Sequence, residues 1–167
     1  MTNGDLFITP GYPAYLPWMT EEQKENNYWR GALCALVNLG VPMNLKGFDY
    51  LLTAISLTAS DPSYIDDVTG RLYADVAAIM EVKPANVEKC MRNAVETLFN
   101  DPDVKRLHGF FGDTVSEKSG KVTNSVFIGR IADDVRKDVT SASLNGIRKR
   151  ILDGLGIKSE ISDNALE

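Results

Sequence analysis

Residues 72–98 constrain the fold of this chain most, because their pattern predicts two short helices joined by a tight turn. In the first helix, residues 72–80, apolar side chains recur three and four positions apart. Residues 81–83 turn the chain. Pro84 then takes the first position of a second helix, where its fixed φ helps and its missing N–H costs nothing. This helix-turn-helix pattern is typical of units that set their second helix into the major groove of DNA.

The second helix, residues 84–98, is amphipathic. Its apolar face is expected to hold Val87, Met91, Ala94, Val95 and Leu98. The opposite face carries base-reading side chains, since Arg and Lys donate to guanine, Asn pairs with adenine and Glu accepts from cytosine. The candidate DNA-binding residues here are Lys83, Asn86, Glu88, Lys89, Arg92 and Asn93. Periodicity alone favours an ordinary core helix with a solvated face, so both interpretations stay open.

Six short segments, two of them within residues 72–98, carry a resemblance to a known family. They are residues 40–42, 46–51, 72–77, 87–96, 111–116 and 123–128. Together they resemble the C-terminal effector domain of the master sporulation response regulator of endospore-forming bacteria, from about residue 33 to about residue 136. No single segment is specific, but their common register over one domain length makes chance similarity improbable.

The resemblance implies a sequence-specific DNA-binding transcription regulator. In that family the loop after the recognition helix is associated with RNA polymerase, which makes Phe110 and Phe111 candidate polymerase or partner contacts, or else plain core residues. The family pattern has an Arg where this chain has Asn86 and a His where it has Asn93. We therefore expect a shifted or relaxed sequence preference.

The same family carries a phosphorylated receiver domain ahead of the effector domain. Only about thirty residues precede the resemblance here, which is too few for such a domain. The expectation is a regulator without its own phosphoacceptor domain. Double-stranded DNA is the expected partner, with RNA polymerase and a second copy of the chain on DNA as further candidates.

Residues 121–125 offer a second place for DNA contact. Thr123, Asn124 and Ser125 are typical helix-capping residues at the start of a predicted helix, and Lys121 lies just before them. A helix N-terminus with polar side chains suits a DNA phosphate, so Lys121, Asn124 and Ser125 are candidate DNA contacts. Plain capping is the alternative.

The remaining pattern predicts an all-α fold, a compact bundle of about six or seven helices. Helices are expected over residues 20–39, 47–59 and 61–68, with a helical turn at 100–103 and an apolar loop at 108–112. The domain layout is an aromatic and proline-rich arm over residues 1–19, an effector-type domain over 20–138, and an extra helix with a polar tail over 139–167. The arm could pack on the first helix or serve a partner.

Composition limits the function classes. A net charge of −5 is awkward for a DNA-binding protein, but residues 117–150 carry eight basic and four acidic side chains, or +4. No nucleophile lies beside a plausible base, and no metal-spaced Cys or His set occurs, which predicts no enzyme, catalytic residue, metal or cofactor. With no membrane-length apolar stretch or signal sequence, a cytoplasmic, nucleoid-associated protein is expected. A non-DNA-binding module, an antagonist or co-regulator that contacts RNA polymerase or a related regulator, is the alternative.

Overall fold

The computed structural model describes residues 15–140 and 151–157, and over these residues the chain contains helices and no strand. The α-helices are α1 (Glu21–Glu25), α2 (Asn27–Leu39), α3 (Lys46–Ser60), α4 (Tyr73–Met80), α5 (Pro84–Phe99), α6 (Val104–Phe111) and α7 (Asn124–Thr140). Short 3-10 turns occupy Pro62–Asp66 and Gly112–Thr114, and a π-helical turn occupies Val68–Leu72. The predicted all-α fold is confirmed.

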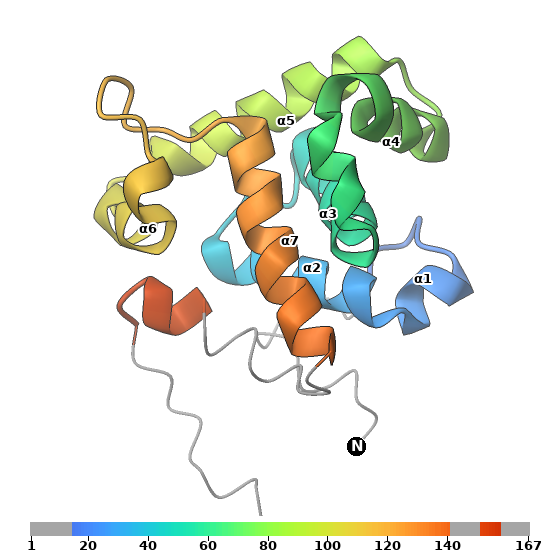
Figure 1. Cartoon of the computed structure of the whole chain (residues 1–167), viewed down its shortest axis with the longest axis horizontal. Helices are drawn as coiled ribbons and strands as arrows, with labels where there is room; N and C mark the ends of the chain where they lie inside the picture. Colours follow the sequence, from blue (N-terminus) through green and yellow to red (C-terminus); the bar gives the residue numbers. More distant parts are fainter. Residues whose placement is uncertain (1–14, 141–150, 158–167) are drawn as a thin grey trace, which may run out of the picture.

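Helix α3 lies at the centre and packs against α2, α5 and α7 (Figure 1). Nearly every position along it is buried, including Phe48, Leu51, Leu52 and Ile55, which are fully enclosed. A helix that is apolar all round has to be covered on every side, and the surrounding helices provide that cover. The core therefore surrounds α3, and α5 covers one edge of it.

The helix predicted over residues 20–39 is two helices. A capping box at Thr20 begins α1, with the Thr20 hydroxyl and the Gln23 side chain each accepting a backbone N–H of the other residue. Asn26 then interrupts the run, and its side-chain oxygen accepts the N–H groups of Tyr28 and Trp29 to begin α2. Gly40, in the left-handed region at φ 91°, ends α2 as predicted.

The segment between α3 and α4 differs from the predicted single short helix. Asp61 caps a 3-10 turn and Asp67 caps the π turn that leads directly into α4. The Arg71 guanidinium joins these turns, bonding to Asp61 at 2.8 Å and to the Ser63 hydroxyl at 2.7 Å. It also lies over the Tyr64 ring. This network fixes the entry to α4.

The helix-turn-helix is present, with α4 and α5 joined by residues 81–83. Helix α5 begins at Pro84 as predicted. Glu81 ends α4 in the left-handed region, at φ 57°, and Val82 N–H donates back to the Ala77 carbonyl at 3.0 Å. Glycine is the residue that adopts this conformation without cost, so Glu81 stores local backbone strain.

We expect Glu81→Gly to stabilise the protein. Relief of the left-handed backbone is worth about 1–2 kcal/mol, and the extra freedom of glycine in the unfolded chain takes back about 0.5–1 kcal/mol. The melting temperature should rise by about 2 °C. Glu81→Ala is the matched control, because it removes the same charge but keeps the strain. A melting temperature that rises equally in both variants would assign the gain to charge and contradict the strain account.

Residues 108–112 are not the predicted apolar loop, because α6 continues through Phe111. Phe110 and Phe111 lie in the core, 5% and 3% exposed. Phe111 packs on the rings of Phe99 and Phe127. Of the two roles left open for these side chains, burial favours the core role over a polymerase or partner contact.

The two ends of the chain are described in part. Residues 1–14 of the predicted arm and residues 141–150 of the predicted C-terminal helix lie outside the described residues. The end of the arm packs on α2, where the Trp18 ring meets the Trp29 ring edge-on at 6.1 Å. Residues 151–154 are helical, and Gly154 lies against the Phe110 ring.

Candidate nucleic-acid interface

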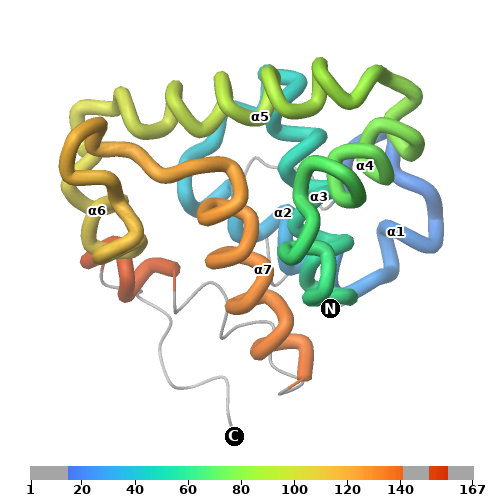
Figure 2. Tube along the Cα trace, turned by 45° about the horizontal axis from the view of Figure 1, so that its top comes forward, coloured from blue at the N-terminus to red at the C-terminus, as the bar shows by residue number. Residues whose placement is uncertain are grey.

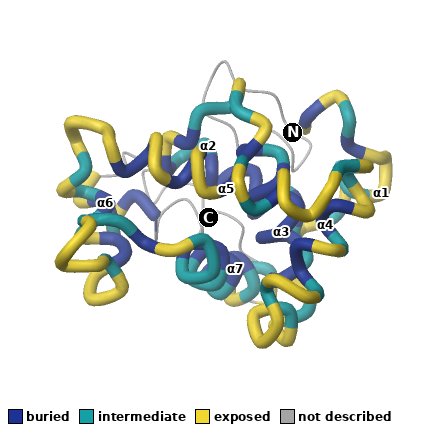
Figure 3. Tube along the Cα trace, turned by 90° about the horizontal axis from the view of Figure 1, so that it is seen from above, coloured by how far each residue is buried: buried dark blue, intermediate teal, exposed yellow. Residues whose placement is uncertain are grey.

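Helix α5 lies along one edge of the molecule, with α4 at one end and α6 at the other (Figure 2). Its predicted apolar face is confirmed, since Val87, Met91, Ala94, Val95 and Leu98 are all buried. The candidate DNA-binding residues on its other side and in the turn before it are exposed: Lys83, Asn86, Lys89, Arg92 and Asn93. Figure 3 shows these exposed turns along α5. The helix therefore presents one continuous polar face.

A close backbone approach sets the depth of α5 on the core. Gly47 of α3 lies against the middle of α5. A Cβ atom at Gly47 would lie 2.1 Å from the Cys90 carbonyl oxygen and 2.7 Å from the Ala94 Cβ. Only glycine allows the two helices to come this close. The Lys46-Gly47 step thus places α5 relative to α3.

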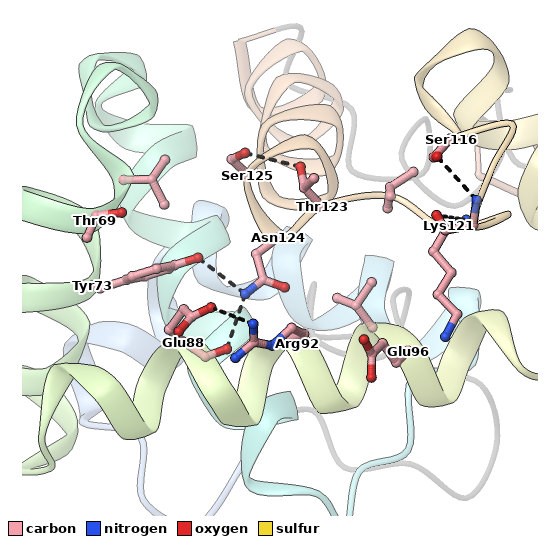
Figure 4. A pocket seen from close by; sticks show the side chains of 14 residues that line it. Thr69, Tyr73, Glu88, Arg92, Glu96, Ser116, Lys121, Thr123, Asn124 and Ser125 are labelled. Atoms are coloured by element: carbon pink, nitrogen blue, oxygen red, sulfur yellow. Dashed lines mark hydrogen bonds and ion pairs between the residues drawn. The ribbon is translucent and has the colours of Figure 1, made fainter.

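A cleft of about 540 Å³ opens between α5, the start of α7 and the π turn (Figure 4). It brings together five of the predicted site residues, Glu88, Arg92, Lys121, Asn124 and Ser125. The other predicted residues, Lys83 before α5 and Asn86, Lys89 and Asn93 on it, are not part of its lining. The polar face of α5 and this cleft are therefore neighbouring features that share Glu88 and Arg92.

The charged side chains of the cleft are balanced in number. Arg92 pairs with Glu88 one turn earlier on α5, at 3.3 Å, and both side chains are substantially exposed. Lys121 and Glu96 also line the cleft. Within the described ranges, no carboxylate lies within ion-pair distance of Lys83, Lys89 or Lys121. Three lysines around α5 are therefore open to an anionic partner.

The N-terminus of α7 meets α5 and α4 at Asn124. The Asn124 side-chain nitrogen donates to the Tyr73 hydroxyl and to the Glu88 carbonyl oxygen, each at 3.2 Å. Tyr73 is 6% exposed, and burial raises the pKa of its hydroxyl. The Thr123 hydroxyl accepts the Val126 N–H and lies 3.2 Å from the Ser125 hydroxyl. The predicted capping by this segment is thus supplied by Thr123.

The segment that carries Lys121 is held by its own backbone and by α6. Ser116 N–H donates to the Lys121 carbonyl at 2.9 Å. His108 Nε2 lies 2.9 Å from the Gly120 carbonyl oxygen, and its ring stacks on Phe99 at the end of α5. His108 has a structural role here, in agreement with the absence of any metal-ligating neighbour in the sequence. Lys121 is therefore held beside α5 by contacts from two elements.

Sequence reasoning missed several residues of the cleft. Thr69, Tyr73, Ser116, Glu96 and Thr123 line it, although none was among the predicted contacts. Tyr73 belongs to the apolar pattern of residues 72–80, and its ring packs in the core. The signal that could have found it is the polar hydroxyl of a buried tyrosine, which usually has a hydrogen-bond partner.

A helix-turn-helix with an exposed basic and amide face agrees with what the comparison with known families finds. The family model described as sporulation initiation factor Spo0A, C terminal, matches residues 33–135. The chain belongs to this Spo0A C-terminal family. The match covers more than half of the chain and contains α3, α4, α5 and α6 complete, together with most of α2 and α7.

The Spo0A C-terminal family consists of DNA-binding effector domains of sporulation transcription factors and is not an enzyme class. Its members are all-α, as this chain is. In the described part of the chain, no group of three or more His, Cys, Asp or Glu side chains is placed to hold a metal ion. No helix there is long and apolar enough to cross a membrane.

Proposed function

We propose that this Spo0A-type domain is a sequence-specific transcription regulator that places α5 in the major groove of DNA. The observation that carries this proposal is the polar face of α5, where exposed Lys89, Arg92 and Asn93 lie on one side of a helix whose other side is buried. An α-helix fits the major groove, and these side chain types pair with base edges there.

Some polar residues of α5 contact bases, and Glu88 orients one of them. Lys89 and Arg92 donate to guanine O6 and N7, and Asn86 and Asn93 pair with adenine. Glu88 lies one turn before Arg92 and orients its guanidinium through their ion pair, which limits the directions from which a base can reach the guanidinium. Glu88 is also the residue that would accept from cytosine when Arg92 turns to a base.

The sugar-phosphate backbone of one strand lies along the cleft in this arrangement. Lys121 and the Ser125 hydroxyl line the cleft, and Lys83 supplies a further cation just before the first residue of α5. Glu96 opposes phosphate binding in the cleft, because its carboxylate has no ion-pair partner among the described residues and repels phosphate. The domain then depends on base contacts more than a strongly basic protein would.

Lys121→Ala should weaken binding to every duplex by a similar factor. A lysine that neutralises one phosphate contributes about one unit to the slope of log Kd against log salt concentration, so that slope should fall by about one. Sequence discrimination should stay as in the unchanged protein. Fluorescence anisotropy at several salt concentrations measures both quantities. A loss confined to the preferred sequence would contradict the phosphate role.

The proposal is tested by selecting duplexes from a random pool with the full chain. The selected duplex and a scrambled version of it are then titrated separately at near-physiological salt. We expect the selected duplex to bind at least about a thousandfold more tightly, as specific complexes do. Failure to enrich any sequence, with equal affinity for the two duplexes, would overturn sequence-specific binding and leave non-specific association with DNA. A second copy of the chain on the DNA would appear as a two-step titration.

A further inference from the structure

The Asn124 side chain joins three helices at a single point. It extends from the first residue of α7, donates to the hydroxyl of Tyr73 at the first residue of α4, and donates to the carbonyl oxygen of Glu88 in α5 (Figure 4). The partners are 51 and 36 residues away in the sequence. These bonds connect both helices of the helix-turn-helix to α7.

The chemistry of the amide fixes which atom points where. The Glu88 carbonyl can only accept a hydrogen bond, so the Asn124 atom that faces it must be the NH2 nitrogen. An amide NH2 carries two N–H donors, and the two bonds use both of them. The remaining amide oxygen only accepts. A phosphate oxygen also only accepts, so the Asn124 side chain has no donor left for DNA while these bonds hold.

The Glu88 carbonyl lies in the part of α5 that carries the proposed base contacts. Glu88 forms the ion pair with Arg92, and its carbonyl belongs to the same turn as Lys89. Gly47 sets how deeply the middle of α5 lies on α3, and the buried apolar face of α5 packs on α3 and α4. Apolar packing is not directional, so the Asn124 hydrogen bonds add a directional contact in the N-terminal half of α5, at Glu88.

We propose that Asn124 is a positioning residue that sets the tilt of α5 through Tyr73 and Glu88, and that it contributes to sequence discrimination without touching DNA. The inference rests on the proposed function, in that discrimination is read out on DNA. It replaces the phosphate contact expected for Asn124 with an indirect role. It also gives the buried hydroxyl of Tyr73 a function, as one end of the same link.

The test compares Asn124→Ala, Tyr73→Phe and the double variant, each in the full chain. Tyr73→Phe keeps the ring in the core and removes only the hydroxyl, so it reports on the link without altering the surface around α7. The first readout is the ratio of the Kd values for scrambled and selected duplexes. The second is the Kd for the scrambled duplex and its salt dependence, which a lost phosphate contact would change. Thermal unfolding establishes that each variant is folded at the assay temperature.

We expect Asn124→Ala to reduce the discrimination ratio about tenfold, equivalent to weakening one base contact. Tyr73→Phe should reduce it in the same direction by a smaller factor, because the Glu88 bond remains. The double variant should be no worse than Asn124→Ala, since both changes break one link. Binding to the scrambled duplex should be unchanged in all three variants.

Two results would overturn the proposal. One is an equal loss on both duplexes in Asn124→Ala, which identifies a phosphate contact. The other is an unchanged ratio in Tyr73→Phe, which shows that Asn124 acts without Tyr73. If Asn124→Ala does not fold, the Tyr73→Phe ratio decides between these outcomes.

Amide hydrogen exchange tests the link between Asn124 and α5 without DNA. If the unchanged protein does not discriminate between duplexes, the proposed function fails, and amide hydrogen exchange along α5 then judges the link. Faster exchange at residues 87–93 in Asn124→Ala, with the same pattern at smaller amplitude in Tyr73→Phe, supports the fixed tilt. Exchange that is unchanged in both variants refutes it.

Discussion

Arg92→Ala is expected to weaken binding to the selected duplex about ten- to a hundredfold. A bidentate contact from arginine to guanine is worth about 1–3 kcal/mol of discrimination, and its loss appears directly in the Kd. The fold should remain, because the Arg92–Glu88 pair is exposed and such a pair contributes about 0.3–0.5 kcal/mol. Fluorescence anisotropy with the selected and scrambled duplexes measures the change, and the selected duplex should lose far more than the scrambled one.

Lys137→Ala is the matched control for Arg92→Ala. It removes the same unit of positive charge from an exposed helical position, but it lies near the end of α7 that points away from α5 (Figure 1). Its effect on either duplex should be less than about twofold, as expected for a charge distant from the interface. If the two variants weakened binding equally and without regard to sequence, Arg92 would be contributing only to net charge.

Gly47→Ala is expected to destabilise the protein by about 3 kcal/mol and to lower its melting temperature by about 6–12 °C. The new methyl group would lie 2.1 Å from the Cys90 carbonyl oxygen, so α3 and α5 would have to move apart along their whole contact. A backbone atom cannot rotate away as a side chain does, which puts the cost at the upper end for overpacking. The discrimination between selected and scrambled duplexes should fall as well, because α5 shifts with its polar face.

Gly109→Ala provides the control for Gly47→Ala. It makes the same change within a helix, but its Cβ atom would lie 3.4 Å from the Gly154 carbonyl oxygen, an ordinary contact. Because alanine favours a helix over glycine by about 0.5–1 kcal/mol, this variant should be as stable as the unchanged protein or slightly more stable. A melting temperature for Gly47→Ala equal to that of Gly109→Ala would contradict the close approach of α3 and α5. Thermal unfolding followed by circular dichroism checks both.

Local signals predicted the helix-turn-helix well. Pro84 marks the first residue of α5, the Thr20 capping box begins α1, and the apolar positions of α5 are buried as their spacing indicated. Each of these depends on residues within one or two turns of helix. The same signals do not determine the π turn before α4, because it depends on Arg71 reaching back to Asp61 and Ser63.

Two helix boundaries were predicted wrongly because intrinsic propensity did not decide them. Residues 108–112 contain two glycines, which disfavour a helix, but packing of Phe110 and Phe111 into the core keeps residues 108–111 helical. Asn26 looked like an ordinary helical position and instead caps a new helix. In both cases tertiary contacts or a competing side-chain bond outweighed intrinsic propensity.

The cleft could be predicted only in part. Lys121, Asn124 and Ser125 were expected near DNA from their place before a helix, but nothing in the local sequence shows that they face Glu88 and Arg92. That arrangement arises because α7 packs across α3 and the first residues of α7 meet α5 (Figure 1). The Asn124 link to Tyr73 spans 51 residues and has no sequence signature.

Base reading by α5 in the major groove can be tested by changing a single atom of the DNA. In the selected duplex, each guanine is replaced in turn by 7-deazaguanine, which removes the N7 acceptor from the major groove and leaves base pairing intact. For at least one guanine, the unchanged protein should lose about tenfold or more in affinity, while Arg92→Ala, already weakened, should be insensitive to the same replacement. Equal affinity of the unchanged protein for every 7-deaza duplex and the parent duplex would contradict guanine reading by α5.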